Sequence, residues 1–384
     1  MTTLGKVARW GSGGTPKRSE AQYFGAGIPW LSISDLNDGE VTDAKESLTQ
    51  LGLENSSAKV VPAGTLLVAM YGSIGKLGIA GRELCTSQAI AFAQPDPLVI
   101  DIRYLFHFLL AERTKLQRLG RGGTQMNIGQ ADLKSWPIPL PPLSEQRRIA
   151  AILDQAGELR AKRRVVLAQL DSLTQAIFID MFGSPSANPK GYPLSTMREL
   201  VDPKRPITYG ILKPGPDLPD GVPYIRVVDM TDRSIHRAGL RRTTEAISSQ
   251  YKRSLLREGD LLLSIRGHVG RLAMVEADVA GANITQDTAR LAITGADPIY
   301  VLECLRSPEL QRWMKTFTKG AAVRGINLTD VKRIQLPLPP ASDQSRFARA
   351  ANDIQRNRQS LLASAGELDL LFASLQHRAF RGEL

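Results

Sequence analysis

Hydrophobic residues follow two different periods along this chain. Short apolar runs bounded by Gly, Pro or Asp are typical of β-strands, and the clearest are Trp30–Ile33, Thr65–Met70, Ile225–Val228 and Asp260–Ile265. Longer stretches that we predict to be helical interrupt these strands, at Tyr104–Leu119 and Ile299–Thr316. Both kinds of element occur in residues 1–141 and again in residues 186–339. We therefore predict two mixed α+β domains, domain 1 and domain 2, each with a curled sheet.

A longer helix is predicted after each domain, over residues 142–185 and 340–384. In the first helix Ser144 is a suitable N-cap and is followed by acidic Glu145, no proline occurs from Ser144 to Phe182, and Gly183 ends the helix. The alternative, in which each helix packs only on its own domain, is disfavoured because about 39 residues at 1.5 Å each span roughly 58 Å, longer than such a domain.

A seven-residue repeat marks one side of each long helix. Its first row holds Ala156, Arg163, Leu170, Ile177, Ile354, Leu361, Leu368 and Leu375. Its second row, three residues further on, holds Leu159, Val166, Leu173, Asn357, Ser364 and Leu371. Such rows predict an antiparallel coiled coil between the two helices, in which the few polar positions fix the register.

The whole chain is an internal repeat. Residues 27–35 (GIPWLSISD) match residues 221–229 (GVPYIRVVD), and residues 64–76 match residues 259–271. Further on, PLPPLSEQ at residues 139–146 matches PLPPASDQ at residues 337–344. The matches keep their order along the chain, so each copy consists of one domain followed by one long helix.

The chain is basic, with 49 Lys and Arg against 38 Asp and Glu and a formal net charge of +11. A surplus of this size favours a polyanionic partner, either nucleic acid or an anionic membrane. No membrane partner is expected, because the apolar runs are far shorter than the ~20 residues that a spanning helix needs and the N-terminus has no apolar signal core. Two cysteines cannot form a disulfide framework, so we expect a cytoplasmic protein. The spacing of the two Cys and four His predicts no metal site.

Several motifs resemble enzyme signatures but are incomplete. Residues 72–76 (GSIGK) lack the first glycine and the Ser or Thr of a phosphate-binding loop, and residues 120–125 (GRGGTQ) lack the third glycine of a dinucleotide-binding fingerprint. Residues 132–134 and 330–332 match only the last part of a metal-dependent nuclease motif, with no cluster of carboxylates before them. We therefore predict no catalytic residue and no cofactor bound by this chain.

Matched loops in the two copies carry the chemistry expected of DNA contacts. Arg pairs with guanine, Gln and Asn pair with adenine, and loop amides bind phosphate. The candidates in domain 1 are Lys17, Arg18, Tyr71, Ser73, Lys76, Arg121, Thr124, Gln125 and Asn127, and those in domain 2 are Tyr209, Lys213, Arg266, His268, Arg271, Lys319, Arg324 and Asn327. In the alternative interpretation, the glycines of these loops only form tight turns and the polar side chains only face water.

These features together resemble one protein family. Residues 14–16 (GTP), 28–36, 64–75 and 122–128 (GGTQMNI) resemble the target-recognition domains of type I restriction–modification specificity subunits. Residues 139–149 (PLPPLSEQRRI) are similar to the start of that family's conserved helix. Domain 2 departs from the pattern at residues 207–215, which is expected if the two domains read different sequences.

The resemblance implies a non-catalytic subunit that binds double-stranded DNA. Each domain would read one half of a bipartite site, and the helices would set the spacer and recruit two methyltransferase subunits, with motor-nuclease restriction subunits joining the complex. S-adenosylmethionine, ATP and Mg²⁺ would then be bound by the partner subunits, and the adenine to be methylated would be flipped out of the duplex. Two other functions stay open at this point: a stand-alone DNA methyltransferase or nuclease fused to its own reader, and a coiled-coil scaffold without a DNA role.

Overall fold

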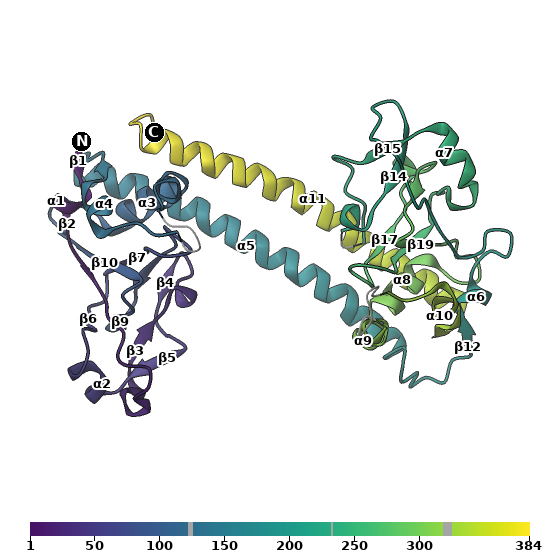
Figure 1. Ribbon diagram of the computed structural model, residues 1–384, viewed down its shortest axis with the longest axis horizontal. Coiled ribbons are helices and arrows are strands. Elements are labelled where there is room, and N and C mark those ends of the chain that lie inside the picture. The colour runs from purple at the N-terminus through teal and green to yellow at the C-terminus, as the bar shows by residue number, and fades with distance from the viewer. Residues whose placement is uncertain (122–125, 232, 318–324) are drawn as a thin grey trace. The chain divides into compact units, whose positions relative to one another are not determined.

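The structure, a computed structural model, describes residues 1–121, 126–231, 233–317 and 325–384. Its contacts divide the chain into two compact units: unit 1 contains Met1–Arg164 and Ala363–Leu384, and unit 2 contains Val165–Leu362. Each unit therefore combines one domain with parts of two long helices, α5 (Leu143–Phe182) and α11 (Ala341–Ala379), which Figure 1 shows in teal and in yellow.

The strands of domain 1 form small sheets with the orders β2-β10-β7-β8-β4, β5-β3-β9-β6 and β1-β11. The strands are β1 (Thr2–Thr3), β2 (Ala8–Ser12), β3 (Phe24–Leu31), β4 (Glu40–Val41), β5 (Glu46–Leu48), β6 (Val60–Val61), β7 (Leu66–Ala69), β8 (Leu77–Ala80), β9 (Leu84–Thr86), β10 (Ile90–Pro95) and β11 (Pro137–Ile138). The helices are α1 (Leu4–Val7), α2 (Gln50–Glu54), α3 (Ile102–Arg118) and α4 (Gln130–Ser135), with 3-10 turns η1 (Ala21–Tyr23) and η2 (Ile33–Asp35).

The strands of domain 2 form sheets with the orders β13-β19-β16-β17, β15-β14-β18 and β12-β20. The strands are β12 (Leu194–Thr196), β13 (Thr208–Tyr209), β14 (Val222–Ile225), β15 (Arg241–Thr243), β16 (Leu261–Ser264), β17 (Leu272–Met274), β18 (Asn283–Ile284), β19 (Thr288–Leu291) and β20 (Gln335–Pro337). The helices are α6 (Met197–Leu200), α7 (Glu245–Gln250), α8 (Pro298–Arg306), α9 (Pro308–Thr316) and α10 (Leu328–Arg333), with 3-10 turns η3 (Val227–Asp229), η4 (Lys252–Ser254) and η5 (Ala277–Val279).

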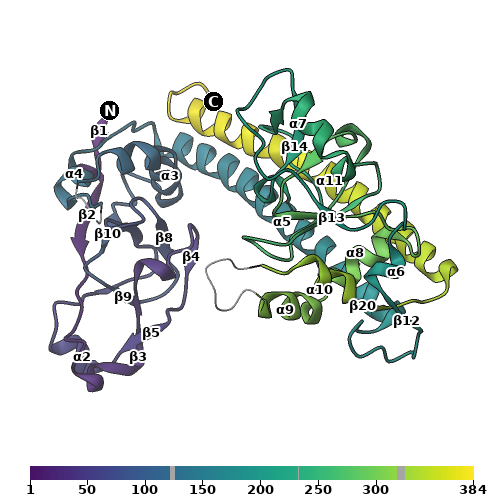
Figure 2. The same ribbon diagram turned by 45° about the vertical axis from the view of Figure 1, so that its right-hand side comes forward.

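The two domains repeat the same strand pairings, as the internal sequence repeat predicts. In domain 1, β10 lies antiparallel between β2 and β7, and in domain 2, β19 lies antiparallel between β13 and β16. The parallel pair β3–β9 likewise corresponds to β14–β18. Each domain is closed by pairing its first strand with its last, β1 with β11 and β12 with β20, the latter pair visible side by side in Figure 2.

Two elements of domain 2 differ from the sequence prediction. The strand expected at Ile225–Val228 ends at Ile225, because the Asp229 carboxylate accepts a hydrogen bond from the Arg226 amide (2.8 Å) and closes the 3-10 turn η3. The single helix expected at Ile299–Thr316 is interrupted at Ser307, whose hydroxyl caps α9 ahead of a proline. Local side chain-to-backbone bonds decided both boundaries.

The repeated PLPP motif explains how each long helix begins. The Tyr104 hydroxyl donates to the Pro139 carbonyl (3.0 Å), and the Tyr300 hydroxyl donates to the Pro337 carbonyl (2.8 Å). Buried Gln146 accepts from the Asp101 amide (2.9 Å) and donates to a carbonyl of the PLPP segment, and Gln344 does the same in unit 2. Because α5 begins at Leu143, the prediction that Ser144 is its N-cap is wrong; Ser144 lies in the first turn.

The long helices contact each other in both units. In unit 1, Arg160 of α5 pairs with Asp369 of α11 (2.5 Å), and Arg148 donates to the Leu384 carbonyl (2.7 Å). Positions advance along one helix as they recede along the other, so the helices are antiparallel, as predicted. Both also enter the domain cores: Ile149, Leu153, Phe372 and Ala379 belong to the core of unit 1, and Phe178, Phe182, Phe347 and Ala351 belong to the core of unit 2.

Only one of the two predicted rows lies in the seam between the helices. The row of Ala156, Arg163, Leu170 and Ile177, with its counterparts in α11, is partly or fully buried. The row of Leu159, Val166 and Leu173 is exposed instead, as are Asn357 and Leu371. The second seam row lies four residues after the first, not three, and contains Leu153, Arg160, Leu167, Thr174 and Met181 in α5 and Ala351, Arg358, Ala365, Phe372 and Ala379 in α11. The assignment of the second row was therefore wrong in both helices, in the same way.

The helix contacts repeat with the sequence. Arg160 pairs with Asp369 in unit 1, and Arg358 pairs with Asp171 (2.9 Å) in unit 2. Arg160 and Arg358 occupy equivalent positions of the repeat, and so do Asp171 and Asp369. Each copy thus supplies one Arg and one Asp to a reciprocal pair of ion pairs, which fixes the antiparallel register.

Among the described residues, one helix, α5, is long and apolar enough by length and composition to cross a membrane. The sequence prediction, based on uninterrupted apolar runs, did not identify it. Two of its apolar side chains, Phe178 and Phe182, are buried in the core of unit 2, where they pack against Tyr300 and Phe347. Packing in a domain core accounts for this part of the apolar character of α5.

Candidate nucleic-acid interface

The structure brings together the two loops of domain 1 that the sequence predicts for DNA contact. Tyr71 and Arg121 each form a β-bridge with Asn127. The Gly72 amide donates to the Met126 carbonyl (3.0 Å), and the Ile128 amide donates to the Met70 carbonyl (3.0 Å). The β7–β8 loop and the segment before α4 therefore form one continuous surface.

Domain 2 repeats this arrangement with other side chains. Arg266 forms a β-bridge with Gly325, and the Ile326 amide donates to the Ile265 carbonyl (2.9 Å). The β16–β17 loop is thus held by the segment before α10 in the same way that the β7–β8 loop is held in domain 1. The two copies present equivalent surfaces.

Glycine conformation and buried anchors determine which side chains of these loops are presented. Gly72 and Gly267 have φ values of 60° and 68°, in the left-handed region where other residues are strained. Ile74 and Val269 are buried behind the loops. The exposed side chains on either side of each glycine are Tyr71 and Ser73 in domain 1 and Arg266 and His268 in domain 2.

The side chains of Lys76 and Arg271 each donate a hydrogen bond to a backbone carbonyl of the protein. The Lys76 ammonium donates to the Ile33 carbonyl of η2 (3.3 Å), and the Arg271 guanidinium donates to the Val227 carbonyl of η3 (3.1 Å). Both side chains were predicted to contact DNA, and their bonds connect each loop to a neighbouring 3-10 turn. These turns expose Ser34 and Val228, two residues that the sequence reasoning missed. The turn in domain 2 was not predicted because a strand was predicted over Ile225–Val228. The sequence signal that indicates a turn in each copy is the Asp whose carboxylate closes it, Asp35 or Asp229.

Three further predicted contact residues, Arg18, Arg121 and Asn327, also bond to other parts of the protein. Arg18 forms a two-bonded ion pair with Glu46 (2.7 and 2.9 Å) and stacks on Phe24 and Trp30. The Asn327 side chain accepts from the Asp330 amide (2.9 Å) and caps α10. Arg121 exchanges both backbone hydrogen bonds with Asn127, while its side chain is exposed. For Arg18 and Asn327, a structural role accounts for the side chain.

The remaining candidates divide into two groups. Lys17, Tyr209 and Lys213 are exposed and lie away from the β7–β8 and β16–β17 loops in the sequence, on the segments before β3 and β14. Thr124, Gln125, Lys319 and Arg324 lie outside the described residues.

The two units differ in the buried polar residues beside the long helix. In unit 1, Asp154 of α5 accepts hydrogen bonds from Arg103 (3.1 Å) and is hydrogen-bonded to buried His107 (2.7 Å). Although burial opposes it, these bonds lower the pKa of Asp154, and burial lowers the pKa of His107. The equivalent positions in unit 2 are Ile299, Glu303 and Asn352, which cannot form the same cluster.

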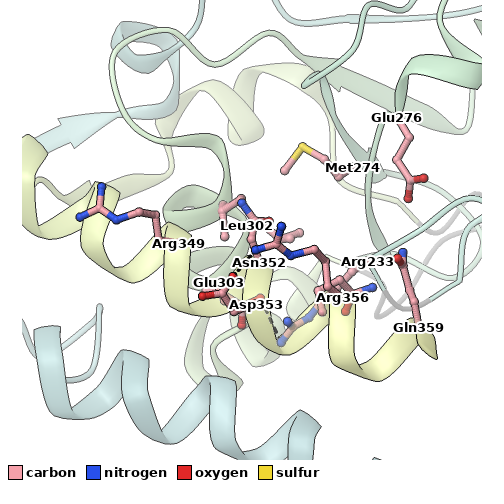
Figure 3. Close-up of a pocket in the computed structure, with 13 residues that line it drawn as sticks. Arg233, Met274, Glu276, Leu302, Glu303, Arg349, Asn352, Asp353, Arg356 and Gln359 are labelled. Atoms are coloured by element: carbon pink, nitrogen blue, oxygen red, sulfur yellow. Dashed lines mark hydrogen bonds and ion pairs between the residues drawn. The ribbon is translucent and has the colours of Figure 1, made fainter. Parts of the chain in front are cut away.

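In unit 2 these replacements line a cavity of about 690 Å³ (Figure 3). Glu303 pairs there with Arg233 (3.1 Å), and both side chains are less than 10% exposed. Burial raises the pKa of Glu303 to about 7, although Arg233 opposes the shift. Among the described residues, Glu303 Oε1 and Arg233 Nε and Nη2 have no hydrogen-bond partner, although Arg306 lies 3.5 Å from the other carboxylate oxygen of Glu303. This pair is therefore less completely hydrogen-bonded than the Asp154 cluster of unit 1.

No group of three or more His, Cys, Asp or Glu side chains in the described residues has a geometry suitable for a metal ion. Cys85 and Cys304 are free and buried. Burial raises the pKa of Cys85 to about 11 and that of Cys304 to about 12, which keeps both as thiols at neutral pH. The chemistry left at the surface of the loops is hydrogen bonding, charge and apolar contact, which is the chemistry of base and phosphate recognition.

Comparison with known proteins gives a consistent result. The family model for the type I restriction modification DNA specificity domain matches residues 1–168 and 216–357. The EcoBI specificity subunit, from a type I restriction enzyme of Escherichia coli, is 26% identical over 416 residues, covering 100% of this chain and 85% of that protein. The EcoKI specificity subunit of Escherichia coli strain K12 is 22% identical over 395 residues, covering 93% and 82%.

A solved structure shares the fold. The S subunit of a type I restriction–modification system from M. genitalium superposes with a TM-score of 0.62 at 16% identity, over 98% of this chain and 95% of that chain. The family model covers well over half of the sequence, in both copies of the repeat. This chain belongs to the family of type I restriction–modification DNA specificity proteins.

Proposed function

We propose that this chain is the non-catalytic subunit that determines which DNA sequence a type I restriction–modification complex recognises. Domain 1 reads one half of a bipartite double-stranded site and domain 2 reads the other. The observation that carries the proposal is the pair of equivalent loop surfaces, which share a backbone frame but expose different side chains at Tyr71 and Arg266 and at Ser73 and His268. The net charge of +11 supplies the non-specific attraction to phosphates.

The long helices recruit two methyltransferase subunits and set the spacing between the half-sites. The apolar side chains that lie outside the seam support this part of the proposal: Leu159 is 55% exposed and Leu371 is 52% exposed. Exposed large apolar side chains along a soluble helix are typical of a surface that a partner covers. Because the two helices repeat, each of two identical partners finds a similar surface. Restriction subunits with motor and nuclease activity join the same complex, and S-adenosylmethionine, ATP and Mg²⁺ are bound by the partners. The complex acts in the cytoplasm.

Sequencing of methylated DNA tests the proposal. Cells that express this chain with a type I methyltransferase subunit should carry methyladenine at one bipartite motif with a fixed spacer. Purified chain alone, given labelled S-adenosylmethionine and the same DNA, should transfer no label. Methyl transfer by the chain alone would show an enzyme fused to its own reader, and methylation without a bipartite motif would refute the assignment of one half-site to each domain.

Salt dependence separates a DNA reader from a coiled-coil scaffold. Binding of duplex DNA to the chain with its methyltransferase should weaken steeply with salt, with a log–log slope of about −0.9 for each phosphate contact. A slope near zero would contradict the electrostatic part of the proposal.

A further inference from the structure

The loop surfaces contain a constant frame and a variable set of positions. Equivalent frame positions carry similar residues in both copies: Gly72 and Gly267, Ile74 and Val269, Lys76 and Arg271. Their roles are also the same, because the glycines adopt positive φ, the apolar residues are buried, and the basic side chains donate to a 3-10 turn. A residue that is kept for the frame carries no information about which bases are read.

The variable positions are exposed and change their chemistry between the copies. On the loops, Tyr71 corresponds to Arg266 and Ser73 to His268. On the 3-10 turns, Ser34 corresponds to Val228, because each is the middle residue of a turn closed by an Asp carboxylate. Val228 is 65% exposed, and Val228 and Arg271 both border a cavity of about 530 Å³. Burial in the domain does not account for an apolar side chain held at such an exposed tip.

The basic frame residues place the turn beside the loop. Lys76 connects the β7–β8 loop to the Ile33 carbonyl, which precedes Ser34 directly. Arg271 connects the β16–β17 loop to the Val227 carbonyl, which precedes Val228. In each domain, therefore, three exposed variable side chains lie on two elements that are tied together by one frame residue.

We propose that these six residues determine the base preference of the two half-sites, and that Lys76 and Arg271 act as positioning residues. This inference rests on the proposed function of the chain. In domain 2, the Arg266 guanidinium suits the O6 and N7 acceptors of guanine, and Val228 suits the methyl group of thymine. In domain 1, Ser34, Tyr71 and Ser73 offer only hydroxyl groups, which pair with several bases. We therefore expect domain 2 to require a G·C pair and an adjacent T·A pair more strictly than domain 1 requires any pair.

The test uses the full chain with its methyltransferase and a plasmid library with randomised half-sites, read by sequencing of methylated sites. Arg266→Ala should relax the preference at one G·C position of the second half-site by about 10- to 100-fold. Val228→Ser should relax the preference at one T·A position by a smaller factor. Both variants should leave the first half-site unchanged, which also shows that the protein folds and assembles.

Matched variants separate reading from positioning. The triple change Val228→Ser, Arg266→Tyr and His268→Ser gives domain 2 the variable residues of domain 1 and should change only the second half-site. Arg271→Ala should lower methylation of all sites several-fold without changing the preferred bases, and Arg271→Lys should restore most of it. An unchanged second half-site in the Arg266 and Val228 variants would overturn the inference, as would a change confined to the first half-site. If the unmodified chain directs no bipartite methylation, the proposed function itself has failed.

Discussion

The two units keep the same backbone contacts but hold different charges in their interiors. The Tyr–Pro and Gln–Pro bonds at the start of each long helix are the same in both units. At the neighbouring matched position, unit 1 has His107, hydrogen-bonded to Asp154 of α5, whereas unit 2 has Glu303, paired with Arg233 of its own domain. The contacts that hold each long helix to its domain are thus the same in the two units, whereas the matched position next to them carries His in unit 1 and Glu in unit 2.

The difference has an energetic consequence. The unit 1 cluster is centred on a carboxylate with several donors, so its charge is satisfied. The unit 2 pair is nearly buried, faces a cavity and leaves three polar atoms without hydrogen bonds. A buried ion pair with incomplete hydrogen bonding adds little stability, yet breaking it by removing one partner is costly. Unit 2 should therefore be the unit that is more sensitive to substitution and to pH at this position.

The largest effect is expected from Arg233→Met. This change removes the nearer cation of buried Glu303 and leaves only Arg306, at 3.5 Å. It should destabilise unit 2 by up to about 3–5 kcal/mol at pH 8 and by clearly less at pH 5.5, where Glu303 is protonated. Urea unfolding, followed by hydrogen exchange in α8, measures the loss. The double variant Arg233→Met with Glu303→Leu should recover most of the stability, and equal losses in the single and double variants would show that the pair is not coupled.

Opposite pH responses of the two units are expected next. The folded pKa of His107 lies below its ordinary value of 6.5, so the folded state binds fewer protons and unit 1 loses stability as pH falls through that range. The folded pKa of Glu303, about 7, lies above its ordinary value of 4.5, so unit 2 loses stability as pH rises from about 4.5 to 7. The change in unit 2 should be on the order of 3 kcal/mol, since the pKa of Glu303 differs by about 2.5 units between the two states.

Hydrogen exchange by mass spectrometry, corrected for intrinsic rates, resolves the two helices in one sample. Between pH 5.5 and 7.5 the protection of α3 should rise and that of α8 should fall. The His107→Gln and Glu303→Gln variants should each flatten only their own response. Parallel responses of α3 and α8 would contradict the contrast between the units.

The helix seam predicts a smaller effect, in a fragment that contains only the first copy. Residues 1–185 carry both Arg160 and Asp171. When two fragments pair antiparallel, Asp171 of one fragment can take the place of Asp369 as the partner of Arg160 of the other, and Arg160 likewise takes the place of Arg358. The fragment should form a homodimer that, with methyltransferase, modifies a palindrome of the first half-site. Arg160→Asp should weaken the dimer by about 1–2 kcal/mol, roughly tenfold.

The charge-exchanged variant Arg160→Asp with Asp171→Arg should restore dimerisation, because the reciprocal ion pairs form again with reversed sign. Sedimentation equilibrium measures all three fragments. A fragment that stays monomeric at high concentration would show that the repeated seam does not support pairing of equal copies.

The sequence predicted the repeat, the two domains, the antiparallel helices and one row of their seam. It failed on the second row because Leu159, Val166 and Leu173 are apolar but face outward. A second row three residues after the first is more hydrophobic than the actual second row, which lies four residues after the first and contains Arg160, Thr174 and Arg358. Arg160 and Arg358 belong to the seam because each pairs with an Asp of the other helix, and Thr174 belongs to it because its hydroxyl bonds back to the Leu170 carbonyl of α5. The partners on the other helix cannot be read from the sequence of one helix.

The candidate interface was predicted in part for a similar reason. The loops at Tyr71–Lys76 and Arg266–Arg271 were selected as candidates because glycines and basic residues match between the copies, and their contact with DNA stays a prediction. Ser34 and Val228 were not among the candidates because the predicted strands Trp30–Ile33 and Ile225–Val228 extended into the 3-10 turns. Arg18 was included although Glu46, distant in sequence, holds it. Partners that are far apart along the chain decide which basic residues are free, and single-sequence patterns do not contain that information.

In the function proposed above, each copy of the repeat reads its own half of one bipartite site. Exchange of domain 2 for a second domain 1 tests it directly, by replacing Leu194–Pro337 with Thr2–Ile138 so that the closing strand pair β12–β20 becomes β1–β11. The reciprocal Arg–Asp pairs of the untouched helices predict half-sites in opposite orientation. Sequencing of methylated sites should then show an inverted repeat of the first half-site with an unchanged spacer. Retention of the original asymmetric site, or loss of any two-part motif while the complex still assembles, would contradict the account.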